Sequence, residues 1–187
     1  MMRIYAILLS VLFIACNSVN ARETKIQSLD EKVSRSDVIL IGRVVSLGKP
    51  DANTVGVYGY AVVEIQNVIK GKDVPKNIKF ITNGVYSEIN PLCCVVGKQY
   101  IIFAQRGFDI FDDSGDEVVA VRKSIKEYHA AVNGPYSAYE VSGKSVIGWP
   151  DQLHKDSLIN TKKVIREIGA AVRRESRVCK LNCVTAL

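Results

Sequence analysis

This sequence has few histidines and lacks several motifs on which many catalytic sites depend. It contains two histidines, His129 and His154, and one tryptophan in 187 residues. It lacks a Gly-x-Ser-x-Gly nucleophile motif, a His-Glu-x-x-His zinc motif and a glycine-rich phosphate loop. Both histidines lie in polar stretches typical of loops or helix starts. We therefore expect a protein that is not an enzyme and that uses no cofactor.

The sequence also lacks an apolar run of the ~20 residues that a transmembrane helix needs. The apolar run from Ile4 to Ala15 is shorter, follows one positive charge at Arg3, and precedes Val19-Asn20-Ala21. Small residues at those last positions are what a signal peptidase requires. The pattern predicts a signal peptide over residues 1–21 and a secreted or periplasmic protein.

Lipoprotein processing is the alternative for this leader. The segment Leu12-Phe13-Ile14-Ala15-Cys16 loosely matches a bacterial lipobox, although Phe13 is unusual at its position. Cys16 would then carry a lipid that anchors the protein in the outer membrane.

No basic stripe interleaved with aromatic residues is present, which argues against a nucleic-acid partner. Removing the leader takes one cation, Arg3, from 25 Lys and Arg, while all 19 acids stay, so the net charge becomes about +5. The remaining 166 residues, 22–187, are the length of one domain with its own core. We expect a single exported domain with a mildly basic, solvated surface.

Four cysteines remain after the leader, namely Cys93, Cys94, Cys179 and Cys183. An even number in an oxidising compartment predicts two disulfides. Because adjacent strand residues point to opposite faces, a bond between the neighbouring pair would need a strained ring. We therefore expect each of the pair to reach the C-terminal segment, in either order, tying the tail 177–187 to the domain.

The spacing of the cysteines and of the acidic residues disfavours both a zinc site and a calcium site. A four-thiolate zinc site is disfavoured because only Cys179-x₃-Cys183 has knuckle spacing. A calcium loop would need oxygens at alternate residues, and the acidic cluster lacks that spacing. We interpret the cluster as turn chemistry; it comprises Asp109, Asp112, Asp113, Asp116 and Glu117. No metal site is expected.

Short β-branched runs separated by turn signals predict a mainly β fold. The predicted strands cover residues 38–45, 60–69, 78–82, 100–104, 108–111 and 118–121, followed by a hairpin over 139–149. The first run is continuously apolar, as in a strand covered on both faces, and Gly42 marks a bulge or a sharp coil within it. The second has a break in its alternation at Asn67, which predicts a bend.

The C-terminal third becomes helical. Its period predicts an amphipathic helix over residues 157–176, with Asp156 or Ser157 as N-cap. The face expected to cover the domain carries Leu158, Ile165, Ile168 and Val172. The other face carries Lys162, Lys163, Arg166, Arg173 and Arg174. We interpret that basic face as solvated, with contact to an anionic membrane or a partner as the alternative.

Three segments together resemble a known family. They are Ser-Asp-Val-Ile-Leu-Ile-Gly-Arg-Val-Val from Ser36, Val-Glu-Ile-x-x-Val-Ile-Lys-Gly from Val63, and Cys-Cys-Val-Val-Gly-Lys-Gln-Tyr-Ile-Ile-Phe-Ala from Cys93. Their order and spacing resemble the netrin-like domain of the tissue inhibitors of metalloproteinases, and especially its bacterial secreted relatives. The resemblance spans about residues 28–123. It implies a closed five-stranded OB-fold Greek-key barrel, with the hairpin and helix of about 136–176 added to it.

The residues that the family's inhibitory mechanism requires are not present in this sequence. In the animal inhibitors, a Cys-x-Cys at the mature N-terminus delivers its amino group and carbonyl to the protease's zinc. The equivalent region here, Arg22 to Gln27, contains no cysteine. An unpinned amino terminus loses binding energy to ordering. The resemblance therefore implies an inhibitor-like fold without the zinc-chelating end.

The function that these features favour is protein binding through loops. We expect an exported, non-catalytic module, inhibitor-like or antagonistic to a toxin, whose protein partner the sequence does not identify. The loops 51–58 and 86–92 are the predicted contact surface, with Val57, Tyr58, Val85 and Tyr86 as its apolar groups. An envelope structural or adaptor protein, held at a membrane by the basic helix or a lipid at Cys16, is the alternative.

Overall fold

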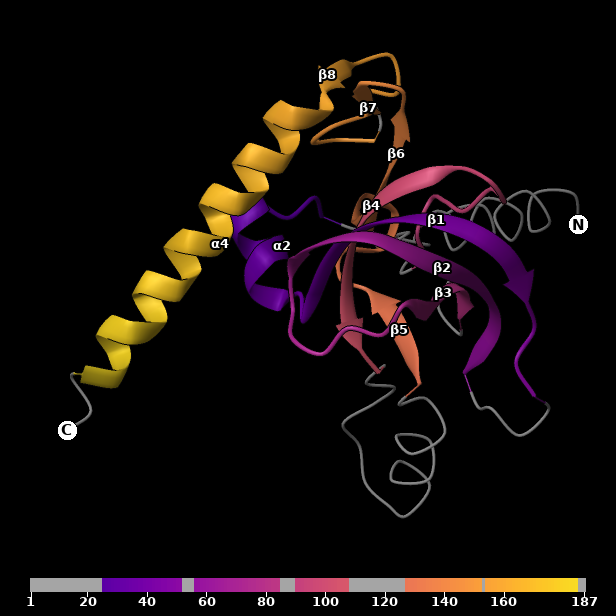
Figure 1. Ribbon diagram of the computed structural model, residues 1–187, viewed down its shortest axis with the longest axis horizontal. Helices are drawn as coiled ribbons and strands as arrows, with labels where there is room; N and C mark the ends of the chain where they lie inside the picture. The colour runs from indigo at the N-terminus through magenta and orange to yellow at the C-terminus, as the bar shows by residue number, and fades with distance from the viewer. Residues whose placement is uncertain (1–24, 52–55, 85–89, 108–126, 153, 185–187) are drawn as a thin grey trace, which may run out of the picture.

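The computed structural model describes residues 25–51, 56–84, 90–107, 127–152 and 154–184, the last five by their backbone alone. The predicted leader and the predicted hairpin over 108–121 lie outside these ranges. The described elements are α2 (Leu29–Arg35), β1 (Val38–Gly48), β2 (Val57–Lys70), β3 (Asn77–Gly84), β4 (Gln99–Arg106), β5 (Tyr128–Ala131), the 3₁₀ turn η2 (Gly134–Ser137), β6 (Ala138–Ser142), β7 (Ser145–Ile147), β8 (Leu158–Asn160) and α4 (Thr161–Val184). The prediction of a mainly β chain with a C-terminal helix is confirmed (Figure 1).

Five strands pair in a ring. The order runs β1-β2-β3-β5-β4, and β4 pairs again with β1. All these pairings are antiparallel except the short parallel one between β3 and β5. Strands β6, β7 and β8 continue the sheet from β4.

β1 and β2 bend because their pairing contains irregularities. The register shifts at three points, and one of them lies between Ile41 and Gly42, where the sequence predicted a bulge. A Cβ at Gly42 would overlap the side chain of Val63 and come within 2.9 Å of the Glu64 carbonyl oxygen. Glycine is therefore required at this close approach of the two strands.

Two hydrophobic clusters share β1 and β4. Val38 and Leu40 of β1 belong to the ring core, which is built mainly from β1, β2, β3 and β4. Ile39 and Ile41 belong to the helix core, which lies against α2, α4, β6 and β7. Adjacent side chains point to opposite faces of a strand, so a continuously apolar run is needed where both faces are covered. The predicted double coverage of this strand is confirmed.

The C-terminal helix differs from its prediction at both ends. Leu158–Asn160 forms strand β8 on the edge of β7, and Leu158 is 65% exposed instead of facing the core. The amide of Lys162 donates to Asn160 Oδ1 at 2.9 Å, so Asn160 provides the cap expected from Asp156 or Ser157. α4 then continues to Val184. Strand pairing to β7 overrides the helical period before Thr161.

The five-strand ring does not coincide with residues 28–123, the span of the family resemblance. The segment from Leu29 to Arg35 is the helix α2, begun by a capping box in which Ser28 and Glu31 exchange hydrogen bonds. The strand that closes the ring, β5, lies beyond residue 123. No helix in the described ranges is both long and apolar enough to cross a bilayer.

Candidate protein-binding surface

Of the four predicted contact residues, one is exposed, one is buried and two lie outside the described residues. Tyr58 is 57% exposed, as expected of a contact residue. Val57 is only 1% exposed and packs with Ile81 and Tyr128, so its predicted exposure is wrong. It is buried because β2 starts beside β3, whose neighbour β5 supplies Tyr128. Val85 and Tyr86 lie outside the described residues.

A neighbouring loop, which the prediction included only up to Leu92, presents more apolar surface. Leu92, Val95 and Val96 are each more than half exposed, at 53%, 54% and 53%. Between them, Cys94 is buried in the ring core and Cys93 packs against it. The loop thus has one buried cysteine, one partly buried cysteine and three projecting aliphatic side chains.

The two cysteines of this loop are bonded to each other. The disulfide joins Cys93 to Cys94. The prediction that each of these cysteines bonds to the C-terminal segment is therefore wrong. Cys179 is a free, exposed thiol on α4, beside α2. Because α4 packs on the helix core while Cys94 lies in the ring core, the fold separates the residues that the sequence paired. The side chain of Cys183 lies outside the described residues.

Hydrogen bonds hold the loop against β1. The amide of Gly97 donates to the Val44 carbonyl at 2.8 Å, and the Val44 amide donates to the Lys98 carbonyl at 3.0 Å. The Val95 amide donates to Tyr100 Oη at 3.1 Å. With the disulfide, these contacts order the loop before any partner arrives, which lowers the entropic cost of binding.

The apolar surface continues onto β1. Pairing between β1 and β4 ends at Arg43, and beyond it Val45 and Leu47 are 43% and 58% exposed. Val45 directly follows Val44, whose amide and carbonyl bond to Lys98 and Gly97 of the loop. We call this set the loop surface; it consists of Val45, Leu47, Leu92, Val95 and Val96.

Charged side chains lie beside the loop surface. Lys98 forms an ion pair with Glu140 at 2.8 Å, and that hydrogen bond raises the pKa of Lys98 above its usual value. Arg43 is exposed at the point where β4 leaves β1. An apolar centre with a charged rim is the usual anatomy of a protein interface.

The two histidines lie in different environments. His129 is buried in β5, and neither ring nitrogen has a hydrogen-bond partner in the described part of the chain. Burial, together with the nearby Arg106 cation, lowers its pKa to about 4, so the ring is neutral. His154 is exposed in the loop before β8, where it contacts Asp151 at 3.1 Å. No cluster of metal-ligating side chains occurs within the described ranges.

Sequence reasoning missed a buried lysine. Lys32 is 2% exposed on α2, and its Nζ donates to Tyr139 Oη at 2.5 Å. Nζ also lies 5.1 Å and 5.9 Å from the ring centroids of Tyr139 and Tyr136. Burial lowers the Lys32 pKa to about 8, opposed by the Asp151 charge. The Ser-x-x-Glu capping box at Ser28 was the available signal for this helix.

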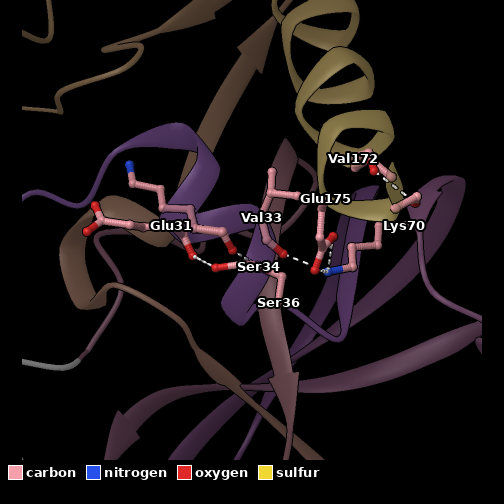
Figure 2. Close-up of polar contacts among 9 residues, drawn as sticks. Glu31, Val33, Ser34, Ser36, Lys70, Val172 and Glu175 are labelled. Atoms are coloured by element: carbon pink, nitrogen blue, oxygen red, sulfur yellow. Dashed lines mark hydrogen bonds and ion pairs between the residues drawn. The ribbon is translucent and has the colours of Figure 1, made fainter. Parts of the chain in front are cut away.

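A groove of about 670 Å³ lies between α2 and α4. Its lining includes Asp30, Ser34, Arg174, Glu175 and Val178. Beside it, as Figure 2 shows, Lys70 at the end of β2 reaches both Val33 of α2 and Glu175 of α4. These contacts join the two helices to the sheet. We therefore interpret the groove as part of the junction between α2, α4 and β2, and not as a binding site.

Comparison with protein-family models and with curated proteins finds no match to this chain.

Proposed function

We propose that this chain is an exported, non-catalytic protein-binding module with a netrin-like OB-fold, and that its partner binds the loop surface. The ring order β1-β2-β3-β5-β4-β1, antiparallel except between β3 and β5, supports an OB-fold assignment. Export rests on the leader pattern of residues 1–21.

The observation that carries the proposal is the exposure of Leu92, Val95 and Val96 on an ordered loop. Exposed aliphatic side chains are normally scattered, whereas here three project from one short segment. A disulfide and backbone hydrogen bonds hold that segment in place, so binding to it would sacrifice little conformational entropy. Apolar groups on a rigid loop are typical of binding sites for protein partners.

The test places a photo-crosslinking amino acid at position 96 of the chain in its native envelope or culture fluid, with the same probe at Leu158 as control. Both positions are exposed aliphatic sites, but Leu158 lies on β8 at the far end of the extended sheet. We expect a discrete cross-linked protein from position 96 that is absent from position 158.

Two double variants test whether the loop surface contributes to the affinity for the partner. Val95→Asp with Val96→Asp should weaken the isolated complex by about 100-fold, because each buried aliphatic contact at an interface centre is worth about 1 to 2 kcal/mol. Leu158→Asp with Val178→Asp makes the same chemical change at two other exposed positions and should leave affinity unchanged. Equal cross-linking from both probes, or equal affinity for both double variants, contradicts the proposal.

A further inference from the structure

A second surface, separate from the loop surface, lies on α4. Six cationic side chains of this helix are exposed, and at 3.6 residues per turn they fall within an arc of about 120°. They are Lys162, Lys163, Arg166, Arg173, Arg174 and Arg177. We call this set the basic face. Val164, Ile168 and Ala171, which pack into the helix core, lie on the opposite side of the helix.

Both acidic residues of α4 within residues 161–180 bond to other parts of the protein. Glu167 accepts a hydrogen bond from Trp149 Nε1 at 3.1 Å. Glu175 accepts one from Lys70 Nζ at 2.8 Å. Both carboxylates therefore serve contacts with the body of the protein, and neither interrupts the cationic stripe.

Five of the six cations have no ion-pair partner among the described residues. The exception is Arg174, whose Nη2 lies 2.6 Å from Asp30 Oδ1. Lys162 is followed four residues later by Arg166, and Arg173 by Arg177, so these neighbours repel each other where a solvated helix usually alternates charge. Such an arrangement is slightly destabilising in water and is relieved by an anionic surface.

The shape of the basic face fits a flat surface. From residue 162 to 177 the stripe runs about 22 Å along one straight helix. α4 lies at the edge of the molecule, with its outer side free of other elements (Figure 1). Among residues 161–180 of α4 there is no aromatic side chain that could stack on a nucleic-acid base. Val164, Ile168 and Ala171 of the helix are already buried against the protein, so these side chains cannot insert into a bilayer.

We propose that the basic face of α4 binds the anionic phospholipid surface of a membrane, peripherally and through charge alone. Each Lys or Arg near such a surface strengthens binding, and the attraction disappears within a Debye length. The interaction leaves the loop surface available, because the two sets share no residue. A protein that recognises its partner with one surface would thus be concentrated at the membrane by the other.

The test is sedimentation of the exported full chain with vesicles of phosphatidylcholine alone or of phosphatidylcholine containing phosphatidylglycerol. We expect binding only to the anionic vesicles, and loss of that binding at about 1 M salt, where the Debye length is about 3 Å. Replacing Lys162, Arg166 and Arg173 by Gln should reduce the partition coefficient by on the order of 100-fold.

The matched control removes three charges elsewhere. Lys49→Gln, Lys72→Gln and Lys76→Gln change exposed positions outside the helix and give the same net charge. This triple variant should retain binding to within a few-fold, and circular dichroism should show both variants folded. Because all chains share one N-terminus, a lipid at Cys16 would raise binding in every sample and to neutral vesicles too.

Three outcomes would overturn the proposal. They are equal loss in both triple variants, binding to neutral vesicles as strong as to anionic ones, and no binding to anionic vesicles at low salt. If vesicles fail but double-stranded DNA is bound in a manner that depends on the basic face, that face recognises a different polyanion. Failure of the loop-surface experiment would leave this result unaffected.

Discussion

Among single residues, Lys32 lies in the most unusual environment. A lysine amine is seldom buried, because its charged form loses hydration. Here it contacts two tyrosine rings and the hydroxyl of Tyr139, which in turn donates to the Pro150 carbonyl at 2.9 Å. Burial also raises the pKa of Tyr139 well above its usual value, so the phenol stays neutral. Burial therefore destabilises the charged amine relative to the unfolded chain, although with a pKa of about 8 it is still mostly protonated at pH 7.

Replacement of Lys32 by Met should stabilise the protein near neutral pH. The fall in pKa from 10.5 to about 8 means that the unfolded chain holds one more proton between those values, so wild-type stability rises with pH across that window. Below pH 8 both states are protonated, and the penalty is at its full size of about 3 kcal/mol. After allowing for lost cation–π contacts and one hydrogen bond, we expect a gain of about 1 to 2 kcal/mol at pH 7.

Urea unfolding at pH 7 and again near pH 10 measures this effect. The difference between the Lys32→Met variant and the wild type should shrink at the higher pH, because the wild-type amine is then neutral when folded. A variant that is less stable than the wild type at both pH values would show that the tyrosine contacts outweigh the burial of the charge.

The cysteine pairing also belongs to the residue scale. In nonreducing peptide mapping, Cys93 and Cys94 should appear in one peptide that is lighter by the hydrogen pair lost on oxidation. Cys179, which is exposed, should react with iodoacetamide without denaturant. A peptide that joins either of the adjacent cysteines to Cys179 would instead restore the pairing inferred from the sequence.

Among the elements, the end of β2 connects α2 and α4. Lys70 Nζ donates to the Val33 carbonyl at 2.7 Å and pairs with Glu175 at 2.8 Å. The two side chains are only 20% and 32% exposed, so water screens this pair less than a surface pair. Val33 itself is fully buried in the helix core. The contact therefore links two helices that are far apart in the sequence.

Removing Lys70 should loosen this junction measurably. We expect Lys70→Met to lower the free energy of unfolding by about 1 to 2 kcal/mol, because a carbonyl and a carboxylate lose their donor. Lys76→Met breaks a pair with Glu64 whose members are 79% and 40% exposed, and it should cost less than about 0.5 kcal/mol. Denaturant unfolding of both variants provides the comparison, and equal losses would mean that burial at the junction adds nothing.

At the scale of the whole molecule, the family resemblance can be tested against inhibition. The animal inhibitors pin their amino terminus with a cysteine, whereas here Cys93 and Cys94 bond to each other and no cysteine lies between Arg22 and Gln27. We expect matrixin-type metalloproteases to remain active at micromolar concentrations of the exported protein. Acetylating the N-terminal amine should also leave any partner binding unchanged. Potent inhibition that acetylation abolishes would reveal a zinc-chelating end.

The strands that the sequence predicted well are those whose local pattern is unambiguous. β1 and β4 each contain a continuous apolar run, 38–42 and 100–104, because both cores use them, so the pattern can be seen in consecutive residues. The hairpin of β6 and β7 was predicted because Gly143 marks its turn. β5 was missed because it has four residues and depends on the edges of β3 and β4 for its pairing.

The sequence alone therefore determined the mainly β class, the C-terminal helix and the bulge at Gly42, since these depend on periodicity and on glycine's lack of a side chain. The tertiary structure decided the pairing of Cys93 with Cys94, the burial of Val57 and Lys32, and the place of Asn160 as helix cap. These properties depend on which distant segments lie side by side. Periodicity reports only the faces of one segment, so contacts between segments are set when the ring closes and the helices pack against it.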